Sequence, residues 1–159
     1  MTLELERLHM IPDSIEREIH IAAPVERVWA VITEPEHLQR WWADAGAEVE
    51  LRPGGAYVLR EREWGEALGR VEVVEPPHRL AYRWAAHHAR DTEPAEGTST
   101  RVEFTLEPEA GGTRLRVVET GFAALATSEE NARRNHEDNV GGWREVLRML
   151  DEYATQVAA

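Results

Sequence analysis

The sequence contains no cysteine and no lysine, and both absences limit what the protein can be. Without cysteine there is no disulfide framework, no thiolate nucleophile and no cysteine zinc site, which fits a reducing cytoplasm. The 18 basic residues, all arginine, stand against 30 acidic ones, so the formal net charge is −12. This excess of negative charge argues against nucleic acid and anionic membranes as partners, because both attract positive surfaces.

Long hydrophobic runs are also missing from the sequence. No stretch approaches the roughly 20 apolar residues of a membrane-spanning helix, and the acidic start lacks the basic-then-apolar order of a signal peptide. We therefore expect a cytoplasmic protein without membrane insertion. A chain of 159 residues suits one domain. We predict a single domain over residues 14–157, preceded by an N-terminal extension over residues 1–13.

Hydrophobic periodicity predicts a strand and two short helices at the start of the domain. Residues 14–22 alternate between apolar and polar side chains, which is the pattern of a strand with one buried face. Pro24 suits the first turn of one helix, and Pro35 starts a second helix that carries Trp41 and Trp42. Because neighbours on a helix point in different directions, at least one of these tryptophans should lie exposed or at a cavity mouth.

Six further strands and a long helix follow. The period-two segments lie near residues 46–51, from 57 onward, 67–74, 80–84, 102–106 and 115–117. A polar stretch over residues 87–98 is expected to be a loop. The last helix is predicted from a seam of apolar residues at spacings of three and four, namely Val140, Trp143, Leu147, Leu150 and Ala154. Gly141-Gly142 within this seam marks either a helix break or a close approach to the sheet.

This order of elements predicts an α+β fold. A meander of seven antiparallel strands has one face to cover, and the C-terminal helix is the only predicted element large enough to cover it. We expect a curved sheet wrapped around that helix. The two short helices after the first strand would then close one end of the space between sheet and helix.

Six short motifs stand in order along the chain. They are Ala23-Pro24-x-Glu26-x-Val28-Trp29, Trp41-Trp42, Arg52-Pro53-Gly54-Gly55-x-Tyr57, Val74-Glu75-Pro76-Pro77-x-Arg79-Leu80-x-Tyr82-x-Trp84, Glu119-x-Gly121-Phe122 and Gly142-Trp143. Together they resemble the SRPBCC or START-like superfamily, and within it the domain named after the C-terminal part of the activator of the ninety-kDa heat-shock protein ATPase. The resemblance extends from about Ile15 to Tyr153 and implies a helix-grip fold.

The resemblance also implies a deep cavity between sheet and helix, which relatives use for lipids, polyketides, plant hormones and other apolar molecules. Some relatives are aromatases or cyclases, and others protect a producing cell from its own antibiotic. The heat-shock activator proper has an additional N-terminal domain, for which 159 residues leave no room. We therefore expect that this chain alone does not stimulate the chaperone ATPase.

Large apolar side chains on the inward faces are candidates for the wall of such a cavity, since ligand pockets are lined mainly by apolar groups with a few polar ones. For Trp29 and Trp143, burial in the core is the simpler explanation. The predicted ligand-binding residues are Trp29, Trp42, Tyr57, Leu59, Val71, Tyr82, Trp84, Phe104, Val117, Glu119, Phe122, His136, Trp143 and Leu147.

Glu119 stands out because it continues the inward-facing set of its strand, where an unpaired carboxylate is costly to bury. We expect first a structural salt bridge or hydrogen bond, with Arg60, Arg62 or Arg83 as possible ion-pair partners. The alternatives are that Glu119 caps a neighbouring backbone or serves as a polar hook in the cavity. His136 is either a polar cavity residue or a surface histidine.

No motif predicts a metal, a cofactor or a catalytic nucleophile. His87, His88 and Asp91 are close in sequence, but neighbours on an extended chain point to opposite faces, and a metal site needs three or four convergent ligands. The three serines lie outside any nucleophile elbow, and no phosphate-binding glycine motif occurs. We therefore name no catalytic residue, metal or cofactor.

Three functions remain open. The first, which we favour, is binding of a small, mostly apolar molecule, aromatic or polyketide-like, in the cavity. The second is a polyketide cyclase or aromatase with Glu119, His136 or a tyrosine as working groups, which would need at least two convergent ionisable groups. The third is contact with a chaperone, which would need an exposed patch. The sequence specifies neither the ligand nor the oligomeric state.

Overall fold

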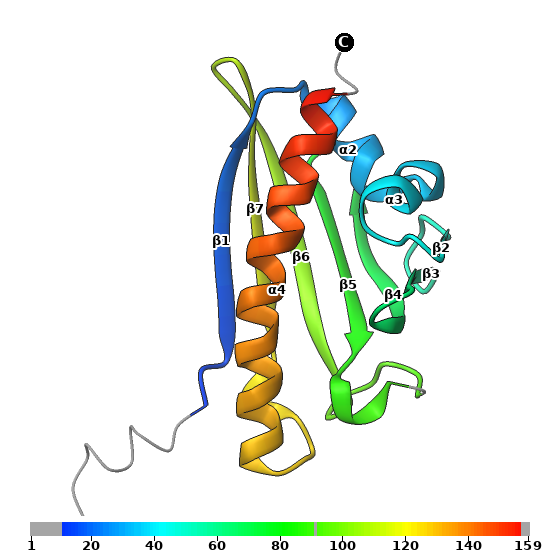
Figure 1. Ribbon diagram of the computed structural model, residues 1–159, viewed down its shortest axis with the longest axis vertical. Helices are drawn as coiled ribbons and strands as arrows, with labels where there is room; N and C mark the ends of the chain where they lie inside the picture. The colour runs from blue at the N-terminus through cyan, green and yellow to red at the C-terminus, as the bar shows by residue number, and fades with distance from the viewer. Residues whose placement is uncertain (1–10, 91, 157–159) are drawn as a thin grey trace, which may run out of the picture.

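The computed structural model describes residues 11–90 and 92–156, and its elements follow the predicted order (Figure 1). Residues 1–10 of the predicted N-terminal extension lie outside the described residues. The elements are β1 (Ser14–Ile21), α2 (Val25–Thr33), α3 (Pro35–Trp41), β2 (Gly46–Val49), β3 (Ala56–Glu61), β4 (Gly65–Glu75), β5 (Arg79–Ala85), the 3-10 helix η1 (His87–Ala89), β6 (Ser99–Glu109), β7 (Gly112–Thr120), the 3-10 helix η2 (Phe122–Ala124) and α4 (Glu129–Gln156). The predicted α+β class is therefore confirmed.

The seven strands form one antiparallel sheet in the order β1-β7-β6-β5-β4-β3-β2. The helix α4 lies along one face of this sheet, and α2 and α3 lie beside its C-terminal part (Figure 1). Fully buried side chains from both layers, such as Phe104, Leu115 and Leu150, make the core between them. This arrangement is the helix-grip fold that the motifs implied.

Two local features allow the sheet to bend around α4. The pairing of β4 with β5 shifts register between Val71 and Val73, and an irregularity of this kind turns a strand. In β4, Gly69 lies so close to β3 that a Cβ atom there would stand 2.5 Å from the carbonyl oxygen of Tyr57. A side chain at Gly69 would push the two strands apart, so the close approach requires glycine.

The helix α4 carries the predicted seam, because Trp143, Leu147, Leu150 and Ala154 are all buried. It begins earlier than the seam, at Glu129, where Oγ of Ser128 accepts a hydrogen bond from the backbone N–H of Asn131 at 3.1 Å. Ser128 is therefore the N-cap residue. Although α4 has 28 residues, no helix in the described part of the chain is long and apolar enough to cross a membrane.

Trp41 and Trp42 are both buried, although they are neighbours in sequence. The helix α3 ends at Trp41, and the backbone of Trp42 has left helical geometry with φ −126° and ψ −57°. This change of direction turns both side chains inward. Nε1 of Trp41 donates a hydrogen bond to the carbonyl oxygen of Val31 at 3.0 Å, which anchors α3 on α2.

The face of the sheet opposite α4 carries a network of arginine and glutamate, which we call the outer ion-pair network. Glu72 accepts hydrogen bonds from Arg83 at 3.1 Å and from Arg101 at 2.8 Å. Glu103 in turn accepts from Arg101 at 3.3 Å and from Arg79 at 2.9 Å. Because side chains alternate along a strand, these residues follow directly from the pattern that buries their neighbours.

Candidate functional site

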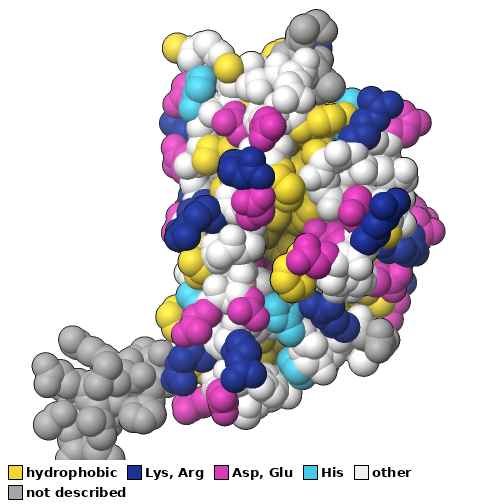
Figure 2. Space-filling view, viewed as in Figure 1, with side chains coloured by type: hydrophobic (Ala, Val, Ile, Leu, Met, Phe, Trp, Pro, Cys, Tyr) yellow, Lys and Arg dark blue, Asp and Glu magenta, His cyan; other side chains and the backbone are white. Residues whose placement is uncertain are grey.

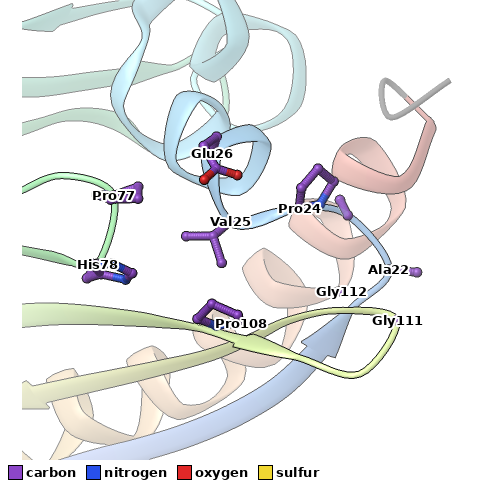
Figure 3. Close-up of a pocket in the computed structure, with 10 residues that line it drawn as sticks. Ala22, Pro24, Val25, Glu26, Pro77, His78, Pro108, Gly111 and Gly112 are labelled. Carbon is purple, nitrogen blue, oxygen red and sulfur yellow. The ribbon is translucent and has the colours of Figure 1, made fainter.

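Two hollows have the volume of a small-molecule site. The first, of about 610 Å³, lies where three turns meet at one end of the sheet, and proline, glycine and alanine supply most of its lining (Figure 3). Its ionisable side chains are Glu26 and His78, and the His78 ring donates a hydrogen bond to the carbonyl oxygen of Leu106 at 3.0 Å. None of the described residues that line it is a predicted ligand-binding residue, so the second hollow is the better candidate for the predicted site.

The second hollow, of about 540 Å³, opens between α4, the β3–β4 hairpin and the segment from the end of β5 through η1. We call it the helix-side cavity. Figure 2 shows hydrophobic side chains in a furrow beside α4, with charged side chains along it. The lining of the cavity has three parts: a floor of tryptophan, a wall of glycine and a charged mouth.

Three tryptophans form the floor of the helix-side cavity. Trp84 of β5 stacks on Trp143 of α4, with ring centroids 5.7 Å apart and 25° between the planes. Trp42 meets both rings edge-on at 6.0 Å, and Tyr82 and Phe104 pack against the floor from the core. Aromatic pairs at such distances contribute about 0.5–1.5 kcal/mol each beyond their burial, so the floor is preformed.

Glu119 lies behind this floor with no exposed surface. Its Oε1 accepts a hydrogen bond from Nε1 of Trp143 at 2.7 Å, and its Oε2 accepts from Nε1 of Trp84 at 2.9 Å and from Oγ1 of Thr100 at 2.6 Å. Nδ2 of Asn139 donates to both oxygens, at 3.1 and 3.0 Å. The donors are all neutral, and two accepting oxygens are the pattern of an ionised carboxylate. The bonds also turn the N–H edges of both indoles away from the cavity.

Strand and helix periodicity bring these donors to Glu119. Trp84 and Thr100 are directly paired across β5 and β6, so their side chains are neighbours on the inner face. Glu119 on β7 lies diagonally across from Thr100, one inward position along the strand. On α4, Asn139 and Trp143 are four residues apart and therefore share a helix face.

The expected inward direction of Glu119 is confirmed, and hydrogen bonds are the structural partners that hold it. Of the two structural contacts expected for Glu119, the hydrogen bond is the one present, and none of the three possible arginine partners pairs with it in the described structure. Arg60 pairs instead with Glu48 at 2.8 Å, and Arg83 pairs with Glu72 at 3.1 Å, both on the opposite face of the sheet. The backbone of Arg62 donates to Asp44. Alternation fixes the face of a side chain within a strand, and Arg60 and Arg83 occupy outward positions, whereas Arg62 lies in the turn after β3.

Gly141 and Gly142 form the wall of the helix-side cavity on α4. The helix passes through both residues without a break, and a Cβ atom built on either would meet no atom within 4 Å. The pair therefore produces neither of the two expected effects, a helix break or a close approach to the sheet. Each glycine in a helix interior costs about 1 kcal/mol relative to alanine, so α4 gives up stability here and leaves open space beside Trp143.

On one side of the mouth, η1 is attached to α4. The backbone N–H of His87 donates to Oδ1 of Asn135 at 3.0 Å, and Nδ1 of His87 lies 3.8 Å from Asp138. This short helix lies within the stretch that was predicted as a loop. Burial lowers the pKa of His87, and the charge of Arg90 acts in the same direction, so the ring is neutral near pH 7.

On the other side, the mouth is bordered by the β3–β4 hairpin, which contributes Glu61 and Trp64. The Trp64 ring is largely exposed, and its carbonyl oxygen accepts a hydrogen bond from Arg90. Burial raises the pKa of Glu61, and the nearby carboxylate of Asp44 adds to this effect, whereas Arg90 opposes it. The mouth thus combines an apolar ring with acidic side chains.

A family model described as Activator of Hsp90 ATPase homolog 1-like protein matches residues 22–155. The chain belongs to this family. The family resemblance of the motifs is therefore confirmed, and with it the SRPBCC superfamily. No curated protein matches this member of the Hsp90-ATPase-activator-like family.

Solved structures share the fold of this family member. Protein MLL2253 from Mesorhizobium loti is 23% identical with a TM-score of 0.73, over 90% of this chain and 97% of that one. CalU16 from Micromonospora echinospora is 27% identical with a TM-score of 0.65, over 89% and 76%. The Aha1 dimer from Colwellia psychrerythraea is 17% identical with a TM-score of 0.70, over 89% and 96%. These likenesses extend across nearly the whole described domain.

Four predicted ligand-binding residues line the helix-side cavity, namely Trp42, Leu59, Trp84 and Trp143. Most of the others are buried in the core, namely Trp29, Tyr57, Val71, Tyr82, Phe104, Val117, Glu119, Phe122 and Leu147. His136 is half-buried, and its Nε2 donates to the carbonyl oxygen of Ser14 at 3.1 Å. The core side chains fill much of the space between sheet and helix, so the cavity lies nearer the surface than the predicted set implies.

The sequence analysis missed the lining residues that lie outside the apolar core. On α4 they form a second stripe beside the buried seam, with Asp138, Gly142, Glu145 and Met149 at spacings of four, three and four. This helical spacing was a signal in the sequence. The residues of the hairpin and of η1 carried no such signal, because only tertiary structure brings them to the mouth.

The histidines considered as metal ligands, His87 and His88, both lie in η1, and Asp91 lies outside the described residues. Within the described ranges, no three histidine, aspartate or glutamate side chains are grouped so that they could hold a metal ion. The lining of the helix-side cavity offers apolar contact at the floor and charged groups at the mouth.

Proposed function

We propose that the protein binds a small, mostly apolar molecule in the helix-side cavity. The observation that carries this proposal is the open space over Trp84 and Trp143, beside Gly141 and Gly142. A volume of about 540 Å³ suits a ligand of drug size. Removal of apolar ligand surface from water would supply most of the affinity, at about 25 cal/mol per Å² before the cost of association is subtracted.

The glycine pair supports a binding role because core packing does not require it. A helix that merely covered the sheet would gain about 1 kcal/mol from alanine at each of the two positions. No atom within 4 Å stands in the way of such a side chain. The two glycines keep this space open at a cost to the stability of the helix. Such a cost is expected where the space serves to hold a ligand.

Family membership supports the same function. Related helix-grip domains use the space between sheet and helix for apolar molecules, and the helix-side cavity occupies part of that space. The alternative function is contact with a chaperone, which the description of the family suggests.

An acid–base enzyme of the cyclase type has less support. Of the groups considered for such chemistry, Glu119 is enclosed behind the floor and His136 is bonded to Ser14. The hydroxyl of Tyr57 donates to the carbonyl oxygen of Ile32 at 2.7 Å. None of these three groups lines the cavity in the described structure. We therefore prefer binding over catalysis.

The variant Gly142→Leu tests the proposal, because leucine would fill the cavity and also improve helix propensity. Ligands from a screen of flavonoids, fatty acids and polyketides, followed by tryptophan fluorescence, should bind the variant at least about tenfold more weakly than the wild type. Arg144→Leu is the matched control, since it adds the same side chain on the exposed side of α4. It should bind as the wild type does.

Ligands that bind all three proteins equally would place the site outside the helix-side cavity and contradict the proposal. A screen without any ligand would also count against it, and the chaperone contact would then become the leading function. Circular dichroism of both variants would show that a loss of binding does not come from unfolding.

A further inference from the structure

Carboxylates outnumber basic groups around the mouth of the helix-side cavity. Among the described lining residues, four carboxylates stand against the guanidinium of Arg90 and the ring of His87. The four belong to Glu61, Glu66, Asp138 and Glu145. Because burial and then Arg90 lower the pKa of His87, its ring adds no positive charge near neutral pH. The mouth therefore has a net negative charge.

Among the described residues, no ion pair with an arginine is found for two of these carboxylates, Glu61 and Asp138. The other two form the ion pairs Arg60–Glu66 at 2.9 Å and Arg148–Glu145 at 2.5 Å. Asp138 has the neutral His87 beside it at 3.8 Å. Burial raises the pKa of Glu61, and the nearby carboxylate of Asp44 adds to this effect, whereas Arg90 opposes it.

The floor contributes to the same potential. Glu119 receives its hydrogen bonds from neutral donors, so no cation within hydrogen-bonding distance in the described structure balances its charge. Donation of an indole N–H to a carboxylate increases the electron density of the ring. Trp84 and Trp143 stack on each other, and Trp143 is almost fully buried, so the half-buried Trp84 offers the cavity the larger ring surface. Electron-rich aromatic rings attract cations, and tryptophan does so most strongly.

We propose that the ligand of the helix-side cavity carries a positive charge, as an amine or quaternary ammonium group on an apolar body. The inference rests on the proposed binding function and specifies the class of ligand. The cavity and its tryptophan floor make the site, and the surrounding charges select among the molecules that fit it. Aromatic side chains are a recognised environment for quaternary ammonium groups, and carboxylates attract any cation.

Isothermal titration calorimetry with three ligands of similar shape tests this inference. They are (naphthylmethyl)trimethylammonium, the neutral naphthylmethanol and the anionic naphthylacetate. The cation should bind the wild type about tenfold more tightly than the alcohol, because it alone gains the attraction of the rings and the carboxylates. The anion should bind most weakly, since the mouth and Glu119 repel it.

The double variant Glu61→Gln/Asp138→Asn removes the two carboxylates without a full partner and keeps the size of both side chains. It should weaken binding of the cation by about fivefold and change binding of the alcohol by less than about twofold. Glu137→Gln is the control, because Glu137 is an exposed neighbour on α4 that does not line the cavity. It should leave the affinities for all three ligands unchanged.

An alcohol that binds as tightly as the cation would overturn the charge inference and leave the binding function intact. The charge inference would also fail if the double variant weakened all three ligands equally. If none of the three ligands bound the wild type, and the wider screen showed no effect of Gly142→Leu, the proposed function would fail and this inference with it.

Discussion

Glu119 joins three strands and a helix through one side chain. It lies on β7 and receives hydrogen bonds from β5, β6 and α4. A buried carboxylate is usually paired with a cation, whereas here four neutral donors share that task. Hydrogen bonds to a charged group contribute about 1.5–3 kcal/mol each, which together offset the cost of burying the charge. The network also fixes the two indole rings of the cavity floor.

Glu119→Ala should lower the free energy of unfolding by about 3–5 kcal/mol, because it removes the buried acceptor that four donors share, and of these Trp84 keeps a hydrogen bond to Thr100. Glu119→Gln should also be destabilising, since its amide group turns a donor toward other donors. Urea unfolding followed by tryptophan fluorescence measures both. The control is Glu107→Gln, which should cost less than about 1 kcal/mol, because Glu107 is an exposed residue of β6 paired with Arg114 of β7. A Glu119→Gln protein as stable as the wild type would contradict the hydrogen-bond assignment.

For single residues, the sequence predicts which way a side chain points but not which residues form hydrogen bonds with it. Period two predicted that Glu119 points inward, and this is correct. It could not predict that Asn139 would supply the amide donor, because that residue is brought in by a helix packed from the other end of the chain. Trp84 and Trp143 were predicted to form part of an apolar cavity wall. Their periodicity does not indicate that their N–H groups donate hydrogen bonds to Glu119.

The element that decides the site is α4, whose two parts have different roles. After the glycine pair it buries a continuous seam, whereas before it the buried residues are Ala132 and Asn135. The first part borders the cavity mouth through Asn135, Asp138 and Asn139. One helix therefore serves both as the cover of the sheet and as a wall of the site.

Leu147→Ala should lower the free energy of unfolding by about 2–5 kcal/mol, since Leu147 is buried in the seam. Val146→Ala is the neighbouring control, because Val146 is partly exposed and borders the cavity. Its cost should stay below about 1.5 kcal/mol. Thermal unfolding followed by circular dichroism compares the two variants. A cost below about 0.5 kcal/mol for Leu147→Ala would mean that this face of α4 is solvated, against the fold described above.

Element order and the seam of α4 could be predicted because each rests on a period within one segment. The cavity could not be located in the same way. A glycine pair inside a helical pattern has several explanations, and the distance between α4 and the hairpin decides among them. That distance also depends on residues of other segments, among them Trp42 in the cavity floor and Gly69, where β4 closely approaches β3.

For the whole molecule, the two faces of the sheet have opposite characters. The inner face is apolar and packs against α4, and the outer face is covered by the outer ion-pair network. With arginine as the basic residue throughout, each cation can offer several N–H groups to more than one carboxylate. The network extends across β4, β5 and β6, so it connects strands in addition to their backbone hydrogen bonds.

Glu72→Gln should lower the free energy of unfolding by about 1 kcal/mol, because Arg83 and Arg101 then lose their shared acceptor and repel each other. The effect should shrink in about 1 M salt, where exposed charges are screened. Glu130→Gln, which breaks a single pair with Arg134 on α4, is the control and should cost about 0.5 kcal/mol or less. Urea titrations at two salt concentrations provide the comparison, and a larger effect for Glu130→Gln would contradict a cooperative network.

The glycine pair of α4 also bears on the local stability of this helix. The turns before Gly141 bury few side chains, and the turns after it are embedded in the core. Backbone hydrogen bonds open most readily where burial is low and glycine is frequent, so thermal fraying of α4 should stop at the pair. The backbone amides of α4 before Gly141 should therefore exchange hydrogen faster than those after it, which would show that one continuous helix has two levels of local stability.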